Sequence, residues 1–296
     1  MDWQERLISL FVYTSKHYDG HIWTYAQRLS PNEFPKFSDS EVITIYLWGI
    51  QRGYKEISKI YQYTREHLLE WFPDLPEYAT YVQRLNRLSE VFVPLIGQIQ
   101  LDFPQLNERE FIRLIDSMPV MMAKGARSGK AKVAKEFANK GYNSVKKTYY
   151  HGVKVHILAF RRNGLLPLPD YIGVTPASEA DINVLKNIAE DIHQTPVYAD
   201  KAYIDGALSH MLAQQESPLN TPVKKKKGQK ELLLFEAALS TLVSQVRQPI
   251  ESLFNWIQEK TGIQVASKVR SFRGLMVHVF GRIAAAMFLL STNFNS

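Results

Sequence analysis

The stretch FIRLIDSMPVMM, at residues 111–122, decides the fold that we predict for this chain. It is a continuous apolar run without helical spacing, which is typical of a strand buried in a sheet. We expect this strand to end near Pro119. One acidic side chain, Asp116, lies within the run. The stretch therefore predicts a buried strand that carries a carboxylate.

Further strands and helices follow this run. The segments TYYHGVKVHILAF (148–160) and LPDYIGVTPA (168–177) have the alternation of strands, and Asn163-Gly164 between them predicts a hairpin turn. The remaining patterns predict, in order, a helix at 178–193, a strand at 196–200, a helix at 202–216, a strand at 219–223, and helices at 231–261 and 272–290. This alternation is typical of an α/β fold.

Two regions of different pattern and charge divide the chain. Residues 1–108 show helical spacing and carry 10 Lys+Arg against 14 Asp+Glu, whereas residues 109–296 carry 26 against 15. We therefore predict an all-α domain over 1–108, followed over 109–296 by an α/β domain with a central mixed sheet flanked by helices.

The short helices of the first domain suggest a helix-turn-helix-like DNA-binding unit. The side chains that would face a DNA groove are Tyr81, Arg84, Asn86 and Arg87. The acidic balance of this domain favours the alternative, a helical subdomain that packs on the α/β part or mediates dimerisation.

Basic side chains cluster at two places in the second domain, which predicts a polyanionic partner such as nucleic acid. The alternative is a solubilising surface. Under the first interpretation the clusters contact the DNA backbone without reading its sequence. The side chains concerned are Lys124, Arg127, Lys130, Lys132, Lys146, Lys147, Lys224, Lys225, Lys226 and Lys227.

Composition excludes several kinds of protein. Apolar residues make up 45% and charged residues 22% of the chain, which excludes wholesale disorder. Cysteine is absent, so a disulfide scaffold, a thiol nucleophile and cysteine-ligated metals are excluded. Carboxylates then become the natural metal ligands, and they favour Mg²⁺ or Mn²⁺. We expect no signal peptide, and we expect the apolar segment 274–290, which contains His278 and Arg282, to be a buried helix too short for a bilayer.

Two acids lie at the ends of predicted strands, where ligands bind in open α/β sheets. These are Asp116 and Asp200, and Glu251 joins them from a later predicted helix. Singly, each aspartate is more often a turn or cap residue. Three carboxylates together are what a pair of divalent cations requires.

Two further acids, Glu179 and Asp181, lie near a predicted helix start. Ser178 with Asp181 matches a capping box. We therefore expect both acids to begin the helix rather than to bind a metal.

Several blocks of the sequence resemble insertion-sequence transposases of the DDE class, which share the ribonuclease-H-like fold. The similarity spans roughly residues 109–290, and its blocks are DSMP (116–119), YYHGVK (149–154), DKAY (200–203), RQPIESLFNW (247–256) and KVRSFRGL (268–275). Two positions depart from the pattern: Ser244 stands where relatives often have Tyr, and Gln258 where they often have Lys, with Lys260 two residues later.

The resemblance implies a ribonuclease-H-like catalytic domain over 109–296 that cleaves and transfers DNA strands at element ends. Asp116, Asp200 and Glu251 become the catalytic and metal-binding triad, with Mg²⁺ or Mn²⁺ as cofactor, two ions being expected. The implied partners are double-stranded DNA and a second copy of the chain on DNA, in the bacterial cytoplasm at the nucleoid, without a membrane. The implied further DNA contacts are Lys201, Arg247, Lys260, Arg270 and Arg273.

Two alternatives remain open at this point. A metal-dependent nuclease of the same fold would lack specificity for element ends, and a regulator derived from a transposase would bind DNA without cutting it. Arg247, four residues before Glu251, orients that carboxylate, holds a phosphate, or forms a plain intrahelical ion pair. Lys201 either contacts DNA or is a solvated surface lysine.

Overall fold

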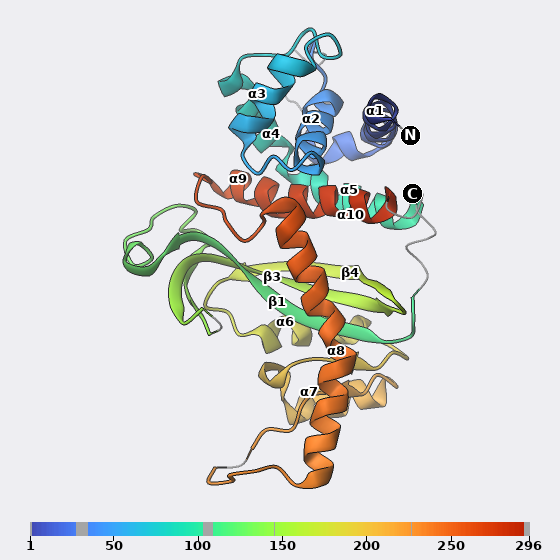
Figure 1. The fold of residues 1–296 in the computed structure, drawn as a ribbon, viewed down its shortest axis with the longest axis vertical. Coiled ribbons are helices and arrows are strands. Elements are labelled where there is room, and N and C mark those ends of the chain that lie inside the picture. Colours follow the sequence, from blue (N-terminus) through green and yellow to red (C-terminus); the bar gives the residue numbers. More distant parts are fainter. Residues whose placement is uncertain (1, 28–34, 103–108, 145, 226, 293–296) are drawn as a thin grey trace. The chain divides into compact units, whose positions relative to one another are not determined.

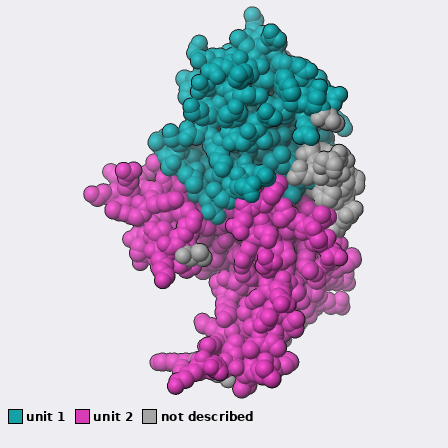
Figure 2. Space-filling model, in the orientation of Figure 1, with its two compact units in different colours: residues 1–106, 257–296 teal, residues 107–256 magenta. Residues whose placement is uncertain are grey.

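The computed structural model describes residues 2–27, 35–102, 109–144, 146–225 and 227–292. These residues form two compact units, 1–106 with 257–296, and 107–256 (Figures 1 and 2). The second boundary falls within helix α8 (Leu234–Thr261). The division differs from the one expected at 108/109, because the C-terminal helices share their apolar core with the N-terminal helices.

Helix α2 (Asp39–Gln51) is the centre of the first unit. Ser38 and Glu41 form a capping box at its start, and every residue from Val42 to Ile50 is buried. A helix that is buried on all sides is a core element. The helices that pack against it are α1 (Trp3–Gly20), α3 (Ile57–His67), α4 (Tyr78–Arg87) and α10 (Arg282–Thr292), and α10 also packs on α5 (Phe92–Asp102).

Helix α4 carries the side chains expected to face a DNA groove. Tyr81 is fully buried, with its hydroxyl 3.4 Å from the Val42 carbonyl oxygen. Arg84 donates to the Asp39 carboxylate at 2.8 Å, and both side chains are largely buried. The prediction that Tyr81 and Arg84 face a groove is therefore wrong, because both are used inside the helical core. Helix-turn-helix-like DNA binding by the unit as a whole stays a prediction.

The C-terminal helical run consists of α9 (Phe272–Met276), a π-helical turn (Val277–Gly281) and α10. Among the described residues, Phe272–Ser291 is the one helix long and apolar enough to cross a membrane, with a mean hydropathy of 1.7. The expectation that it is too short for a bilayer is wrong, because the run is 20 residues long. Of the 18-residue stretch with this hydropathy, 78% is buried, as is usual for the core helix of a globular unit.

The second unit contains a mixed sheet, as predicted, but the described residues form six strands where the sequence predicted five, because β2 lies in the stretch expected to be a loop. Its strands are β1 (Arg113–Lys124), β2 (Asn139–Asn143), β3 (Thr148–Arg162), β4 (Leu165–Pro176), β5 (Val197–Tyr198) and β6 (Leu219–Asn220). The order is β2-β3-β1-β5-β6, with β4 also paired to β3. The pairs β1–β3, β2–β3 and β3–β4 are antiparallel, whereas β1–β5 and β5–β6 are parallel.

Strand β1 runs past Pro119, contrary to the prediction. Strand β5 pairs with β1 only at Arg113 and Leu114, so the rest of this edge has no neighbouring strand among the described residues. An open edge tolerates the missing N–H of proline. The predicted hairpin at Asn163-Gly164 is confirmed, with Arg162 paired to Leu165 across the turn.

Helices lie on both faces of this sheet (Figure 1). Ile115 of β1 packs in one apolar cluster with residues of α6 (Asp181–Ile188) and α7 (Gly206–Gln214). Successive side chains of a strand point to opposite faces. Asp116 therefore points away from that cluster, and its carboxylate is bonded to Arg247 of α8.

Candidate active site

Asp116 lies inside strand β1, on its open edge, and the prediction that it ends a strand is wrong because β1 continues to Lys124. Both of its carboxylate oxygens are engaged. Oδ1 accepts a hydrogen bond from the Ser117 N–H at 2.8 Å, and Oδ2 accepts one from Arg247 Nη1 at 2.8 Å. Burial raises the pKa of Asp116 from 3.8 to about 6, opposed by Arg247 and the Ser117 N–H and reinforced by the charges of Asp200 and Asp181. The raised pKa thus reflects burial above all, and the neighbouring carboxylates add to it.

Arg247 joins two of the three predicted catalytic acids. It lies on α8 with only 15% of its side chain exposed, and it reaches Asp116, 131 residues earlier in the chain. Its other terminal nitrogen donates to Glu251 Oε1, one helical turn away. The guanidinium therefore lies between the Asp116 and Glu251 carboxylates, a place that suits a cation.

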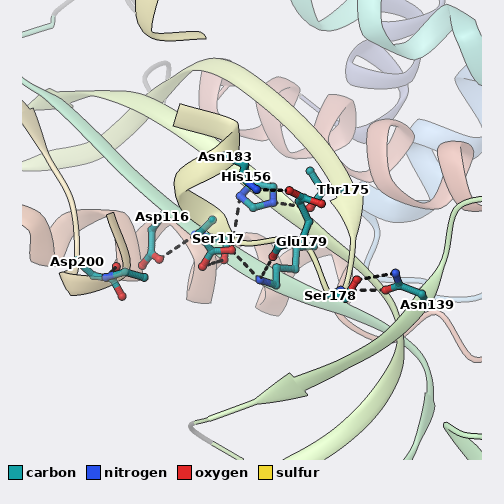
Figure 3. Close-up of polar contacts among 12 residues, drawn as sticks. Asp116, Ser117, Asn139, His156, Thr175, Ser178, Glu179, Asn183 and Asp200 are labelled. Atoms are coloured by element: carbon teal, nitrogen blue, oxygen red, sulfur yellow. Dashed lines mark hydrogen bonds and ion pairs between the residues drawn. The ribbon is translucent and has the colours of Figure 1, made fainter. Parts of the chain in front are cut away.

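Asp200 follows β5 and lies beside Asp116 in Figure 3. Its Oδ1 accepts a hydrogen bond from the Ala202 N–H at 2.7 Å, so it caps the short 3-10 helix η6 (Lys201–Tyr203). The same carboxylate contributes to the raised pKa of Asp116. Asp200 thus has the cap role that its position suggested and also adds charge to the site.

Tyr203 places a hydroxyl group in this charged region. Its side chain is fully buried, and no described residue offers its oxygen a hydrogen-bond partner. Burial raises the pKa of Tyr203, and the charges of Asp181, Asp116 and Asp200 raise it further. Buried polar groups are nearly always paired, so an unpaired phenol beside carboxylates is notable.

The donor set suits a hard divalent cation. Carboxylate oxygens are the ligands that Mg²⁺ and Mn²⁺ prefer, and a positive group already lies between Asp116 and Glu251. Within the described ranges, however, no group of three or more acidic or histidine side chains is close enough to hold a metal ion. The residues fit such a cation chemically, and Arg247 occupies the place between two of them.

The comparison with known proteins assigns the family. Residues 107–271, more than half of the chain, match the family described as Transposase DDE domain. The chain belongs to the DDE-domain transposases. No curated protein and no solved structure matches it.

Sequence reasoning missed a polar network beside Asp116 of this transposase. Asp181 accepts hydrogen bonds from Lys154 Nζ at 2.7 Å and from Ser117 Oγ at 3.1 Å. The predicted capping box is wrong, because Ala180 is the N-cap residue and makes no side-chain cap. The residues lie on β1, β3 and α6, so only tertiary structure brings them together and no local signal could have found the network.

His156 completes this network from β3. Its Nε2 lies 2.7 Å from Thr175 Oγ1, and its Nδ1 lies 4.0 Å from Asp181 Oδ1. Burial lowers the pKa of His156 to about 4. The imidazole is therefore neutral near pH 7 and does not compensate the charge of Asp181.

Nearly all side chains predicted to contact DNA lie on the surface of the transposase. Arg247 is the exception, because it is largely buried against Asp116. Lys226 lies outside the described residues. The exposed ones are Lys124, Arg127, Lys130, Lys132, Lys146, Lys147, Lys201, Lys224, Lys225, Lys227, Lys260, Arg270 and Arg273.

The β2–β3 hairpin adds aromatic rings to this basic surface. Tyr142 and Tyr149 are directly paired across the two strands, and each is about half exposed. Lys140 lies over the Tyr149 ring at 4.3 Å. Exposed rings among lysines are a common feature of nucleic-acid interfaces. The composition of residues 124–147 did not predict this strand pairing.

Proposed function

We propose that this transposase cleaves DNA and transfers the cut strands at the ends of an insertion sequence. The catalytic groups are Asp116, Asp200 and Glu251. The observation that carries the proposal is the Arg247 guanidinium, which brings Asp116 and Glu251 to one place although they lie far apart in sequence. The family match supports transposition as the general function.

The proposed fold of the catalytic part is ribonuclease-H-like. In support, an antiparallel group, β4-β3-β1, and a parallel group, β1-β5-β6, meet at the strand that carries Asp116. Asp200 then follows the neighbouring parallel strand β5. Two acids on adjacent strands of one sheet suit a shared ligand.

Asp116, Asp200 and Glu251 would hold Mg²⁺ or Mn²⁺, two ions by family resemblance. When bound, such cations supply positive charge that activates the attacking oxygen and stabilises the leaving oxygen of a phosphodiester. Asp116 is ionised at neutral pH, because its pKa of about 6 lies below it. Arg247 keeps the carboxylates of Asp116 and Glu251 oriented, and its positive charge favours a nearby phosphate.

The exposed basic side chains would hold double-stranded DNA by its phosphates, without reading its sequence. Pairing of two element ends requires two copies of the chain, so we propose a homodimer on DNA. The expected location is the bacterial cytoplasm, at the nucleoid.

The test compares cleavage of duplexes that end in the element's inverted repeats with cleavage of scrambled duplexes, in Mg²⁺ and in Mn²⁺. D116N, D200N and E251Q are each expected to abolish cleavage while DNA binding persists. D170N is the matched control, because Asp170 forms an ion pair with Arg113 in the same unit.

Three results would contradict the proposal in different ways. Full cleavage by all three variants refutes the catalytic assignment. Equal cleavage of scrambled duplexes makes the protein a nuclease of the same fold. Specific binding without any cleavage by the wild type makes it a regulator.

A further inference from the structure

Asp181 makes two directed contacts from the first turn of α6. Its Oδ1 accepts from Lys154 Nζ of β3, and its Oδ2 accepts from Ser117 Oγ of β1. Lys154 is fixed in turn, because it also donates to the Glu179 carbonyl oxygen at 2.6 Å. One carboxylate therefore ties a helix start to two adjacent strands.

Ser117 connects this network to the predicted catalytic acid. Its hydroxyl group donates to Asp181, and its backbone N–H donates to Asp116 Oδ1 at 2.8 Å (Figure 3). The N–H is available to Asp116 because β5 leaves this part of the β1 edge open. A shift of the Ser117 backbone would therefore move the group that orients the Asp116 carboxylate.

Burial shields the contacts of Asp181 from water. The Lys154 and Asp181 side chains are only 18% and 19% exposed, so water competes weakly for them. The Lys154 ion pair joins α6 to β3. The bond to Ser117 is additional, and it is the one that leads to Asp116.

We propose that Asp181 is a positioning residue for Asp116 that acts through Ser117. It holds the Ser117 backbone so that its N–H fixes one oxygen of Asp116 and leaves the carboxylate oriented toward a divalent cation. The inference rests on the proposed function of Asp116. Groups that hold metal ligands in place typically change metal affinity 10–100-fold when they are removed.

The test measures Mn²⁺ affinity and thermal stability separately on the full chain. The dissociation constant comes from the electron paramagnetic resonance signal of free Mn²⁺, and the melting temperature is recorded in EDTA. We expect S117A and D181N to weaken Mn²⁺ binding about tenfold. S117T keeps the hydroxyl group and is expected to restore the wild-type affinity.

N139A is the matched control. Asn139 makes two hydrogen bonds to Ser178, which hold the segment before α6 without touching Ser117 or Asp116. It is expected to lower the melting temperature and to leave Mn²⁺ affinity unchanged.

Unchanged Mn²⁺ affinity in S117A overturns the inference, and so does an affinity in S117T that stays as weak as in S117A. D116N separates this failure from that of the proposed function. If D116N loses Mn²⁺ binding while S117A keeps it, only the positioning role is wrong. If D116N also binds Mn²⁺ normally, Asp116 is not a metal ligand and both proposals fail.

Discussion

Replacement of Asp116 by asparagine should change how stability depends on pH. In the folded protein the pKa of Asp116 is about 6, against an ordinary value of 3.8. The protonated carboxyl group is thus favoured by folding, and this contribution is full below about pH 4 and is lost as pH rises through 6. The difference in pKa corresponds to about 3 kcal/mol. Because only 18% of the side chain is exposed, solvent screening reduces this little.

The measurement is urea unfolding in EDTA from pH 4 to pH 7.5, with amide hydrogen exchange in β1 and β3 as the probe of this unit. The free energy of unfolding of wild type minus that of D116N is expected to fall by about 2.5 kcal/mol over this range, because asparagine does not titrate and the unfolded carboxyl group is already partly ionised at pH 4. D205N is the control of opposite sign, since a backbone N–H and Lys186 lower the pKa of Asp205.

Two parallel curves for wild type and D116N would refute this reasoning. They would mean that Asp116 titrates alike in the folded and unfolded chain, and hence that Arg247 and the Ser117 N–H fully offset burial and the neighbouring carboxylates. A difference that rises with pH would mean that Arg247 outweighs burial. Either result would show that burial does not dominate the pKa of Asp116.

Three further predictions test other parts of the structure. Y203F should leave the free energy of urea unfolding in EDTA unchanged or raise it by up to about 1 kcal/mol, because the lost hydroxyl group has no partner; a loss of 2 kcal/mol or more would reveal a bond to it. G152A should prevent soluble folding, since an added Cβ would lie 2.0 Å from the Val120 carbonyl oxygen, and a normal melting temperature would contradict this. Y142T combined with Y149T should weaken binding of single-stranded DNA at least fivefold, because each stacked base contributes about 1–3 kcal/mol. The dependence of affinity on salt concentration should stay the same, since no charge is lost. Affinity equal to that of the wild type in a titration of labelled oligonucleotide would exclude stacking.

The sheet was predictable where local pattern decides it. The Asn163-Gly164 turn and the alternation on both sides of it specify the hairpin of β3 and β4 without help from the rest of the chain. The end of β1 was not predictable, because Pro119 is tolerated only where an edge is open, and the open edge results from the shortness of β5. Whether a strand lies at the edge or in the interior depends on the assembled sheet, and the periodicity of one segment does not reveal it.

The composition of the two compact units was not predictable from the sequence for a similar reason. The charge balance and the spacing of apolar residues both change near residue 108. These changes indicate where helices give way to strands along the chain, but not which elements pack together. The segment 274–290 is apolar apart from His278 and Arg282, and this composition predicts burial but not which elements the helix packs against. Its core turned out to be that of the N-terminal helices, against α2 and α5.

The residues of the candidate site were predictable only where they lie in the sequence motifs of the family. Arg247 and Glu251 share one helix turn, so their ion pair follows from sequence spacing. The contact of Arg247 with Asp116 does not, because it depends on which face of the sheet α8 covers. Asp181 was assigned to a helix cap by the same spacing rule, and tertiary contacts with Lys154 and Ser117 prevailed over it.

The charges around Asp116 have a consequence for the order of binding. Lys154 is paired with Asp181, which leaves three carboxylates, those of Asp116, Asp200 and Glu251, beside the positive charge of Arg247. A DNA phosphate would be repelled from the carboxylates even though the surrounding surface attracts DNA. A divalent cation would remove that conflict, because it is attracted to the acids and in turn attracts the phosphate. We therefore expect the basic surface to bind DNA without metal, and a DNA strand to approach the proposed catalytic acids only when a divalent cation is bound.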